Sequence, residues 1–148
     1  MKAILMLLCL SLLTIPLLSI AETPAAGDAI LGIWFNAEKD AKIEVYKVDG
    51  KYCGKVVWLK NPNDTQGKPK TDIENPDPKL RNRPRLGLVV LTDLKHAGGN
   101  SYEKGRIYDP KKGKTYACQA ELANPRLLKL RGYIGISLIG RTSEWTRP

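Results

Sequence analysis

The chain has 148 residues and carries 24 Lys and Arg against 15 Asp and Glu, which gives a formal net charge of +9 at pH 7. With one His and three Cys it lacks the usual ligand sets of a zinc site, and it has no Gly-rich phosphate loop. We therefore expect no metal ion and no cofactor. The basic residues alternate with acidic ones along most segments, so the charge does not predict a nucleic-acid-binding protein.

The first 21 residues have the layout of a secretory signal peptide. Lys2 precedes an apolar run over residues 4–20, and Ser19 and Ala21 place small residues at the −3 and −1 positions of a cleavage site. The sequence predicts that residues 1–21 are cleaved and that residues 22–148 form one exported domain with no transmembrane segment. An uncleaved membrane anchor is the alternative.

The remainder of the chain predicts short antiparallel strands. Residues 41–48 (AKIEVYKV) alternate apolar and polar side chains, and the Asp49-Gly50 pair that follows is a strong hairpin signal. Similar patterns predict eight strands, at residues 32–37, 41–48, 51–60, 86–94, 101–109, 114–122, 126–134 and 140–147. Sequential antiparallel strands of this number favour an all-β, up-and-down barrel, because closure leaves no open edge. A two-sheet sandwich is the alternative.

A long polar interruption over residues 61–85 separates the third and fourth predicted strands. Its second part reads NPDPKLRNRP, in which Asp77 and Pro78 are suited to the N-cap and first position of a short helical turn. Leu80 is the one apolar side chain placed to pin that turn to the barrel.

Two interpretations of this loop remain open. As a plug, it closes one barrel end, with Leu80 in the core and Arg81 and Arg83 bound to carbonyls or carboxylates. As a gate, it lines the barrel mouth, where Arg81, Arg83 and Arg85 receive an anionic head group, since arginine is suited to bidentate recognition of carboxylates and phosphates.

Four further residues are candidates for ligand binding. Trp58, Tyr108 and Tyr133 are the large side chains expected in the barrel interior. Arg106 shares a strand face with Tyr102 and Tyr108 by the two-residue period, and an inward arginine there would require a partner or a ligand anion. Ordinary core packing or an exposed amphipathic ring is the alternative for each of the aromatic residues.

Two cysteines, Cys53 and Cys118, remain after loss of the predicted signal peptide. An exported protein lies in an oxidising compartment, where a disulfide between them is possible if their Cα atoms come within ~7 Å.

The start and end of the predicted domain resemble the lipocalin and calycin pattern. Gly32-Ile33-Trp34 opens the first strand as G-x-W, and Arg141 lies on the last strand. The resemblance implies that Trp34 and Arg141 are structural, with the guanidinium stacked on the indole at the closed end of the barrel.

A second resemblance covers nearly the whole predicted domain. The blocks GIW (32–34), CGKVVWL (53–59), NPDPKLRNRPRLGL (75–88), GRIYDPKKGKTY (105–116) and RGYIGISLIGRTSEWTR (131–147) are similar to a bacterial exported family known as domain of unknown function 2147. This resemblance implies a lipocalin-like fold and a periplasmic location in a Gram-negative bacterium. It implies no established activity.

The sequence favours a non-enzymatic barrel that binds a small apolar or amphipathic ligand. No recognisable catalytic motif is present, because the single His96 has no nucleophile motif around it. The first alternative is a cell-envelope interaction protein whose basic surface meets an anionic glycolipid or a partner protein. The second alternative is a small enzyme that uses Tyr and Arg side chains.

Overall fold

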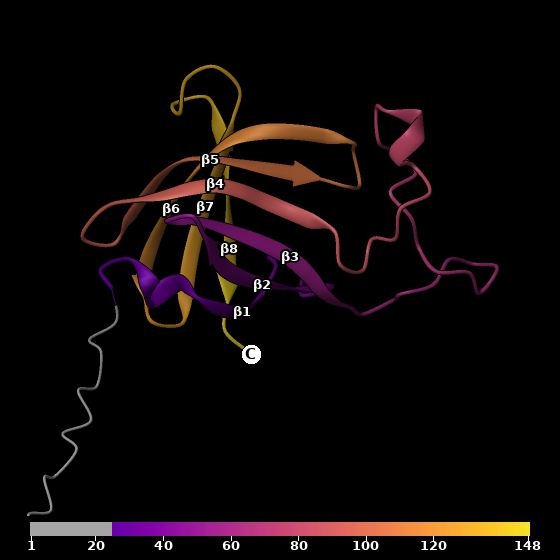
Figure 1. The fold of residues 1–148 in the computed structure, drawn as a ribbon, viewed down its shortest axis with the longest axis horizontal. Helices are drawn as coiled ribbons and strands as arrows, with labels where there is room; N and C mark the ends of the chain where they lie inside the picture. Colours follow the sequence, from indigo (N-terminus) through magenta and orange to yellow (C-terminus); the bar gives the residue numbers. More distant parts are fainter. Residues whose placement is uncertain (1–24) are drawn as a thin grey trace, which may run out of the picture.

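A computed structural model describes residues 25–148, which form a closed barrel of eight antiparallel strands in sequence order (Figure 1). The elements in chain order are η1 (Asp28–Ile30), β1 (Gly32–Phe35), β2 (Ala41–Val48), β3 (Lys51–Leu59), η2 (Pro78–Leu80), β4 (Val89–Gly98), β5 (Ser101–Asp109), β6 (Lys114–Asn124), β7 (Leu127–Tyr133) and β8 (Gly140–Thr146). Pairing of Phe35 with Thr146 closes the barrel between β1 and β8. The predicted up-and-down barrel is therefore confirmed. The predicted signal peptide lies outside the described residues.

The connections between strands define two different ends of the barrel. Tight turns join β2 to β3, β4 to β5 and β6 to β7 at the closed end, where η1 also lies. The opposite end carries residues 36–40, 60–88, 110–113 and 134–139, and we call these four connections the mouth. The longest of them, residues 60–88, extends away from the strands (Figure 1). A barrel with one closed end and one looped end has a single natural entrance for a ligand.

The closed end is held by Trp34 and Arg147. The Trp34 indole is fully buried and donates to the Ile30 carbonyl at 2.8 Å, while the Arg147 guanidinium lies 4.0 Å from the centre of the ring. Arg147 also donates to the carbonyls of Leu31 and Ala29, each at 2.8 Å. The last strand and the segment that follows it are thereby tied to the start of the barrel.

The expectation that Arg141 stacks on Trp34 is wrong, because Arg147 occupies that place. Strand β8 starts at the mouth and runs toward the closed end, so Arg141 near its start lies at the opposite end of the strand from Arg147. Arg141 lines the barrel mouth instead.

A β-bulge in β5 changes which side chains face the interior. The register with β6 shifts between Tyr102 and Gly105, where Lys104 adopts a left-handed backbone conformation (φ 61°). Tyr102 and Gly105 are both buried as a result, and Arg106 is exposed. The two-residue period predicted that Arg106 shares a face with Tyr102, and this prediction is wrong because the extra residue between them reverses the alternation.

A second irregularity turns Trp58 outward. The register between β2 and β3 shifts between Lys42 and Ile43. Ile43 pairs with Val56, whereas Lys42 pairs with Trp58. Trp58 is 38% exposed and packs edge-on against Phe35. The expectation of an interior Trp58 is therefore wrong.

The two cysteines are free, so the possible disulfide is contradicted. Cys118 is fully buried in the core, whereas Cys53 lies between the buried Tyr52 and Gly54 on β3 and is partly exposed. The two side chains belong to opposite faces of strands that are not neighbours.

Thiol labelling of residues 22–148 is expected to distinguish the two cysteines. Burial raises the pKa of the Cys118 thiol to about 12, and the reactive species is the thiolate. We expect a disulfide reagent to modify Cys53 rapidly and Cys118 only after denaturation. Equal rates for the two thiols in the native protein, or no thiol reactivity in denaturant, would contradict this assignment.

Candidate ligand-binding cavity

The barrel encloses a cavity of about 620 Å³ that opens at the mouth. Its inner wall is largely apolar and comes from six strands, through Ala41, Ile43, Val56, Leu59, Val90, Ile107, Leu130 and Trp145. The alternating sequence pattern places most of these side chains inward, and the bulges in β3 and β5 turn Leu59 and Ile107 inward as well. The volume lies within the ~300–1,000 Å³ range of small-molecule sites.

The entrance of the cavity is polar and predominantly basic. Its charged lining consists of Lys70, Arg85, Lys111, Lys112 and Arg141 with the acidic Glu38, Asp40 and Asp109. Lys111 donates to Asp40 at 2.8 Å, so this lysine is neutralised within the protein. Partial burial works against ionisation of Asp40, yet hydrogen bonds from Lys111 and Asn36 hold its pKa below the usual value.

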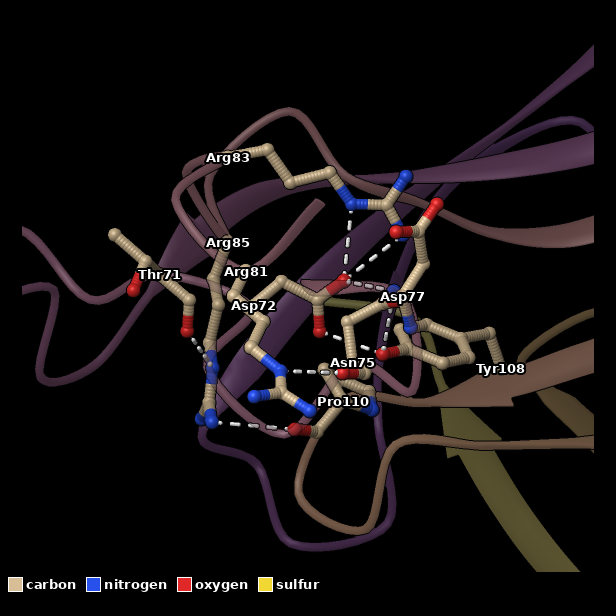
Figure 2. A network of polar contacts seen from close by, with 9 residues as sticks. All are labelled: Thr71, Asp72, Asn75, Asp77, Arg81, Arg83, Arg85, Tyr108 and Pro110. Atoms are coloured by element: carbon tan, nitrogen blue, oxygen red, sulfur yellow. Dashed lines mark hydrogen bonds and ion pairs between the residues drawn. The ribbon is translucent and has the colours of Figure 1, made fainter. Parts of the chain in front are cut away.

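Two basic residues of the long loop reach the cavity because its two arms pair with each other. Backbone N–H groups of Asp72 and Arg85 donate to the carbonyls of Arg83 and Lys70, at 3.0 and 2.9 Å. The Arg85 guanidinium donates to the carbonyls of Thr71 and Pro110, which ties both arms to the β5–β6 connection (Figure 2). Lys70 and Arg85 are thereby held at the entrance of the cavity.

A buried carboxylate anchors the rest of the long loop (Figure 2). Asp72 has no exposed surface and accepts from the Tyr108 hydroxyl at 2.6 Å and from the Asn75 amide at 2.8 Å. Arg83 donates to the same carboxylate through Nε at 2.9 Å and forms an ion pair through Nη2 at 2.8 Å. Burial and the hydrogen bond to Asp72 raise the pKa of Tyr108. These contacts fix the loop on the outer face of β5.

The predicted helical turn is confirmed, but the predicted role of Leu80 is wrong. Asp77 is the N-cap of η2 and accepts from the Lys79 N–H at 3.0 Å, with Pro78 at the first position of the turn. Leu80 is 39% exposed and belongs to no part of the core. The turn stands away from the barrel, because Asp72 and Asn75, rather than an apolar side chain, pin the loop (Figure 1).

The loop corresponds to neither of its two predicted roles in full. Arg81 donates to the Asn75 carbonyl at 2.8 Å and Arg83 binds Asp72, which are the scaffold contacts of the plug interpretation. The loop nevertheless leaves the barrel open, and Arg85 lines the entrance as the gate interpretation predicts. The scaffold residues and the entrance residue are therefore different arginines.

The remaining predicted site residues are divided between two places. Tyr108 and Tyr133 line the cavity entrance. Arg83, Arg106 and Tyr108 meet at a smaller hollow of about 270 Å³ on the outer side of β4 and β5. Ligand contact by any of these residues stays a prediction.

Sequence reasoning did not identify Lys70, Lys112 or Arg141 as candidates for ligand binding. Lys70 and Lys112 lie in turn-rich segments that look like ordinary polar loops. Arg141 was given a structural role through the resemblance to lipocalins. Its position at the start of the last predicted strand, where that strand leaves the mouth, is the signal that could have placed it at the entrance.

Within residues 25–148 no group of three or more His, Cys, Asp or Glu side chains is arranged to hold a metal ion. None of the helices in this part of the chain has the length and apolar character required to span a membrane.

The closed eight-stranded barrel with an apolar interior and one looped entrance defines a lipocalin-like protein. A solved structure supports this class: protein HP1028 from the human pathogen Helicobacter pylori, which is described as belonging to the lipocalin family. It is 31% identical, with a TM-score of 0.68 over 80% of this chain and 82% of that protein. The chain belongs to the family described as uncharacterized protein conserved in bacteria (DUF2147), whose model matches residues 32–147. No curated protein sequence matches it.

Proposed function

We propose that this protein binds a small amphipathic molecule, with its apolar part in the barrel and an anionic end at the mouth. The observation that carries the proposal is the apolar cavity of about 620 Å³ with a basic entrance. Small-molecule sites combine an apolar wall with a few placed polar groups in this way. The described residues suggest no catalytic constellation, so we propose binding without chemistry.

The charges at the entrance favour an anionic end group. Asp40 already neutralises Lys111, and the Arg85 guanidinium keeps its positive charge while bonded to neutral carbonyls. Among residues 25–148, Lys70, Lys112 and Arg141 take part in no ion pair. Glu38 and Asp109 also line the entrance, but the basic residues outnumber them, so a carboxylate or phosphate at the mouth would meet a net positive charge.

The location of this activity is also a proposal. The signal-peptide pattern of residues 1–21 supports export, and the family match begins only at residue 32. Fractionation of the native host, with detection of the chain and sequencing of its N-terminus, tests this. A protein that begins at Glu22 and occurs with periplasmic markers is expected, and a full-length cytoplasmic chain would contradict it.

Filling the cavity is expected to weaken binding of a fluorescent fatty acid such as parinaric acid. Gly132 lines the cavity, and a Cβ atom there would lie 3.4 Å from Ile107 Cγ2, which is ordinary contact. Gly132→Leu should displace about four methylene groups of ligand, at ~0.8 kcal/mol each, and so weaken binding ~200-fold. Fluorescence titration of residues 22–148 measures the change.

The matched control is Ala117→Leu, which adds a leucine to an exposed position on β6, the strand next to β7. It should leave probe affinity unchanged. Arg141→Gln should weaken binding of the fatty acid more than binding of the corresponding fatty alcohol, because only the acid carries a charge. Absence of probe binding by the parent protein, or equal binding by Gly132→Leu and Ala117→Leu, would contradict the proposed function.

A further inference from the structure

The β7–β8 connection carries an unusual group of exposed apolar side chains. Within residues 25–148, the three most exposed large apolar residues all lie here, with Leu138 84%, Ile139 73% and Ile134 72% exposed. Ile136, in the same segment, is 58% exposed. We call these four residues the apolar tip. Single exposed apolar residues are common in soluble proteins, but such a concentration in six consecutive positions typically marks an interaction surface.

The tip is held in place by its polar surroundings. The Arg131 guanidinium donates through Nε to the Ser137 carbonyl at 2.6 Å and through Nη2 to the Leu138 carbonyl at 3.1 Å. Its Nη1 reaches the Thr142 hydroxyl at 3.1 Å, and the Ile139 N–H donates to the Ile136 carbonyl at 3.1 Å. The backbone of the tip is therefore bonded to the barrel, and the apolar side chains are left outside. Figure 1 shows this connection projecting beyond the ends of the strands.

Basic residues surround the tip at the mouth. Arg131 lies beneath it, Arg141 follows Ile139 by two residues on β8, and Lys112 lies on another connection of the same entrance. Apolar side chains that project beyond a group of basic side chains suit a bilayer with anionic headgroups. Apolar side chains enter the acyl boundary, while Lys and Arg side chains near the surface are attracted to the anionic headgroups.

We propose that the apolar tip docks this protein on the surface of an anionic lipid bilayer, with Ile136 and Leu138 inserted among the lipids. The cavity would then face the membrane, because Ile134 and Ile139 belong both to the tip and to the lining of the cavity. Docking itself does not require a bound ligand. Transfer of an amphipathic ligand between bilayer and barrel through this shared wall rests on the proposed function above.

Vesicle sedimentation tests the docking with residues 22–148. Vesicles of equal parts phosphatidylglycerol and phosphatidylcholine are compared with vesicles of phosphatidylcholine alone. The parent protein should bind the anionic vesicles preferentially. The double variant Ile136→Ser, Leu138→Ser should bind them at least about tenfold more weakly, since two side chains no longer enter the acyl region.

The control double variant is Val48→Ser, Ile73→Ser, which removes two apolar side chains that are 46% and 57% exposed but lie outside the tip. It should bind vesicles like the parent protein. Equal loss in both double variants, or no binding of the parent protein to anionic vesicles, would overturn the proposal. If the tip covers a second copy of this chain instead, the tip variant will convert a dimer to a monomer without any vesicle effect, and this too would overturn it.

The same tip variant separates docking from ligand binding. Ile136 and Leu138 do not line the cavity, so parinaric acid affinity measured without vesicles should be unchanged. Loss of vesicle binding with intact probe binding supports the docking site. Failure of the parent protein to bind the probe would instead contradict the proposed function and leave the vesicle result to stand on its own.

Discussion

Arg147→Leu is expected to lower the free energy of unfolding by about 2–4 kcal/mol. The substitution removes the cation–π contact with Trp34, which contributes ~0.5–2 kcal/mol. It also removes charged hydrogen bonds to the Leu31 and Ala29 carbonyls, at ~1.5–3 kcal/mol each. Hydration of the freed carbonyls offsets part of this loss. Urea denaturation followed by tryptophan fluorescence measures the change, because the buried Trp34 reports on the same end of the barrel.

The matched control is Arg141→Leu, near the start of β8, whose last residue directly precedes Arg147. Arg141 is exposed and lines the mouth, so its replacement should change stability by no more than about 0.5 kcal/mol. Arg147→Lys should recover only part of the loss, since an ammonium group cannot reproduce the planar fork that reaches both carbonyls. A larger loss in the free energy of unfolding for Arg141→Leu than for Arg147→Leu would show that Arg147 does not hold the closed end of the barrel.

Asp72→Ala is expected to release the long loop and to cost about 2–4 kcal/mol. The carboxylate is fully buried, and its removal leaves Tyr108, Asn75 and Arg83 without their common acceptor. Breaking a buried pair from one side costs ~3–5 kcal/mol, and we expect less here because the Arg83 side chain is 38% exposed and can regain water.

Limited trypsin digestion detects this loosening directly. Cleavage after Lys79 and Arg81 should become faster in Asp72→Ala, while the β-barrel strands stay resistant. The control is Asp77→Asn, which removes a carboxylate from the same loop but retains a good N-cap for η2. Unchanged cleavage in Asp72→Ala would mean that the Asp72 contacts do not hold the loop.

Local sequence patterns were sufficient to predict the barrel. The alternation over residues 41–48 produced β2 with the same bounds, and Asp49-Gly50 produced the β2–β3 turn. The capping of η2 by Asp77 also follows from a local rule, because the N-cap and the residue that it bonds lie two positions apart. Such features depend on neighbouring residues alone.

Errors arose where one extra residue changed the direction of a strand's side chains. Arg106 and Trp58 were expected inside, and the bulges at Lys104 and beside Val57 turned both outward. A bulge is set by pairing between strands, which a single strand's alternation does not reveal. The disulfide expectation failed for a related reason, because the faces of Cys53 and Cys118 depend on both strands' positions in the barrel.

The candidate site was only partly predictable, because its residues come from separate connections. Tyr108 and Tyr133 were identified as large side chains and do line the entrance, whereas Lys70 and Lys112 become neighbours of the cavity only after the loops fold. The wrong expectation that Arg141, and not Arg147, stacks on Trp34 also arose because the contact depends on the folded barrel. Both arginines lie within the last predicted strand, and the direction of that strand in the barrel decides which one reaches Trp34.

Native mass spectrometry of the protein, purified without detergent from its own host, tests the central claim most directly. We expect a discrete added mass that is lost on denaturation and absent from Gly132→Leu, which would identify a molecule carried in the cavity. A parent protein that shows only its own mass and also fails to bind parinaric acid would contradict the claim that this barrel is a binding protein for amphipathic molecules.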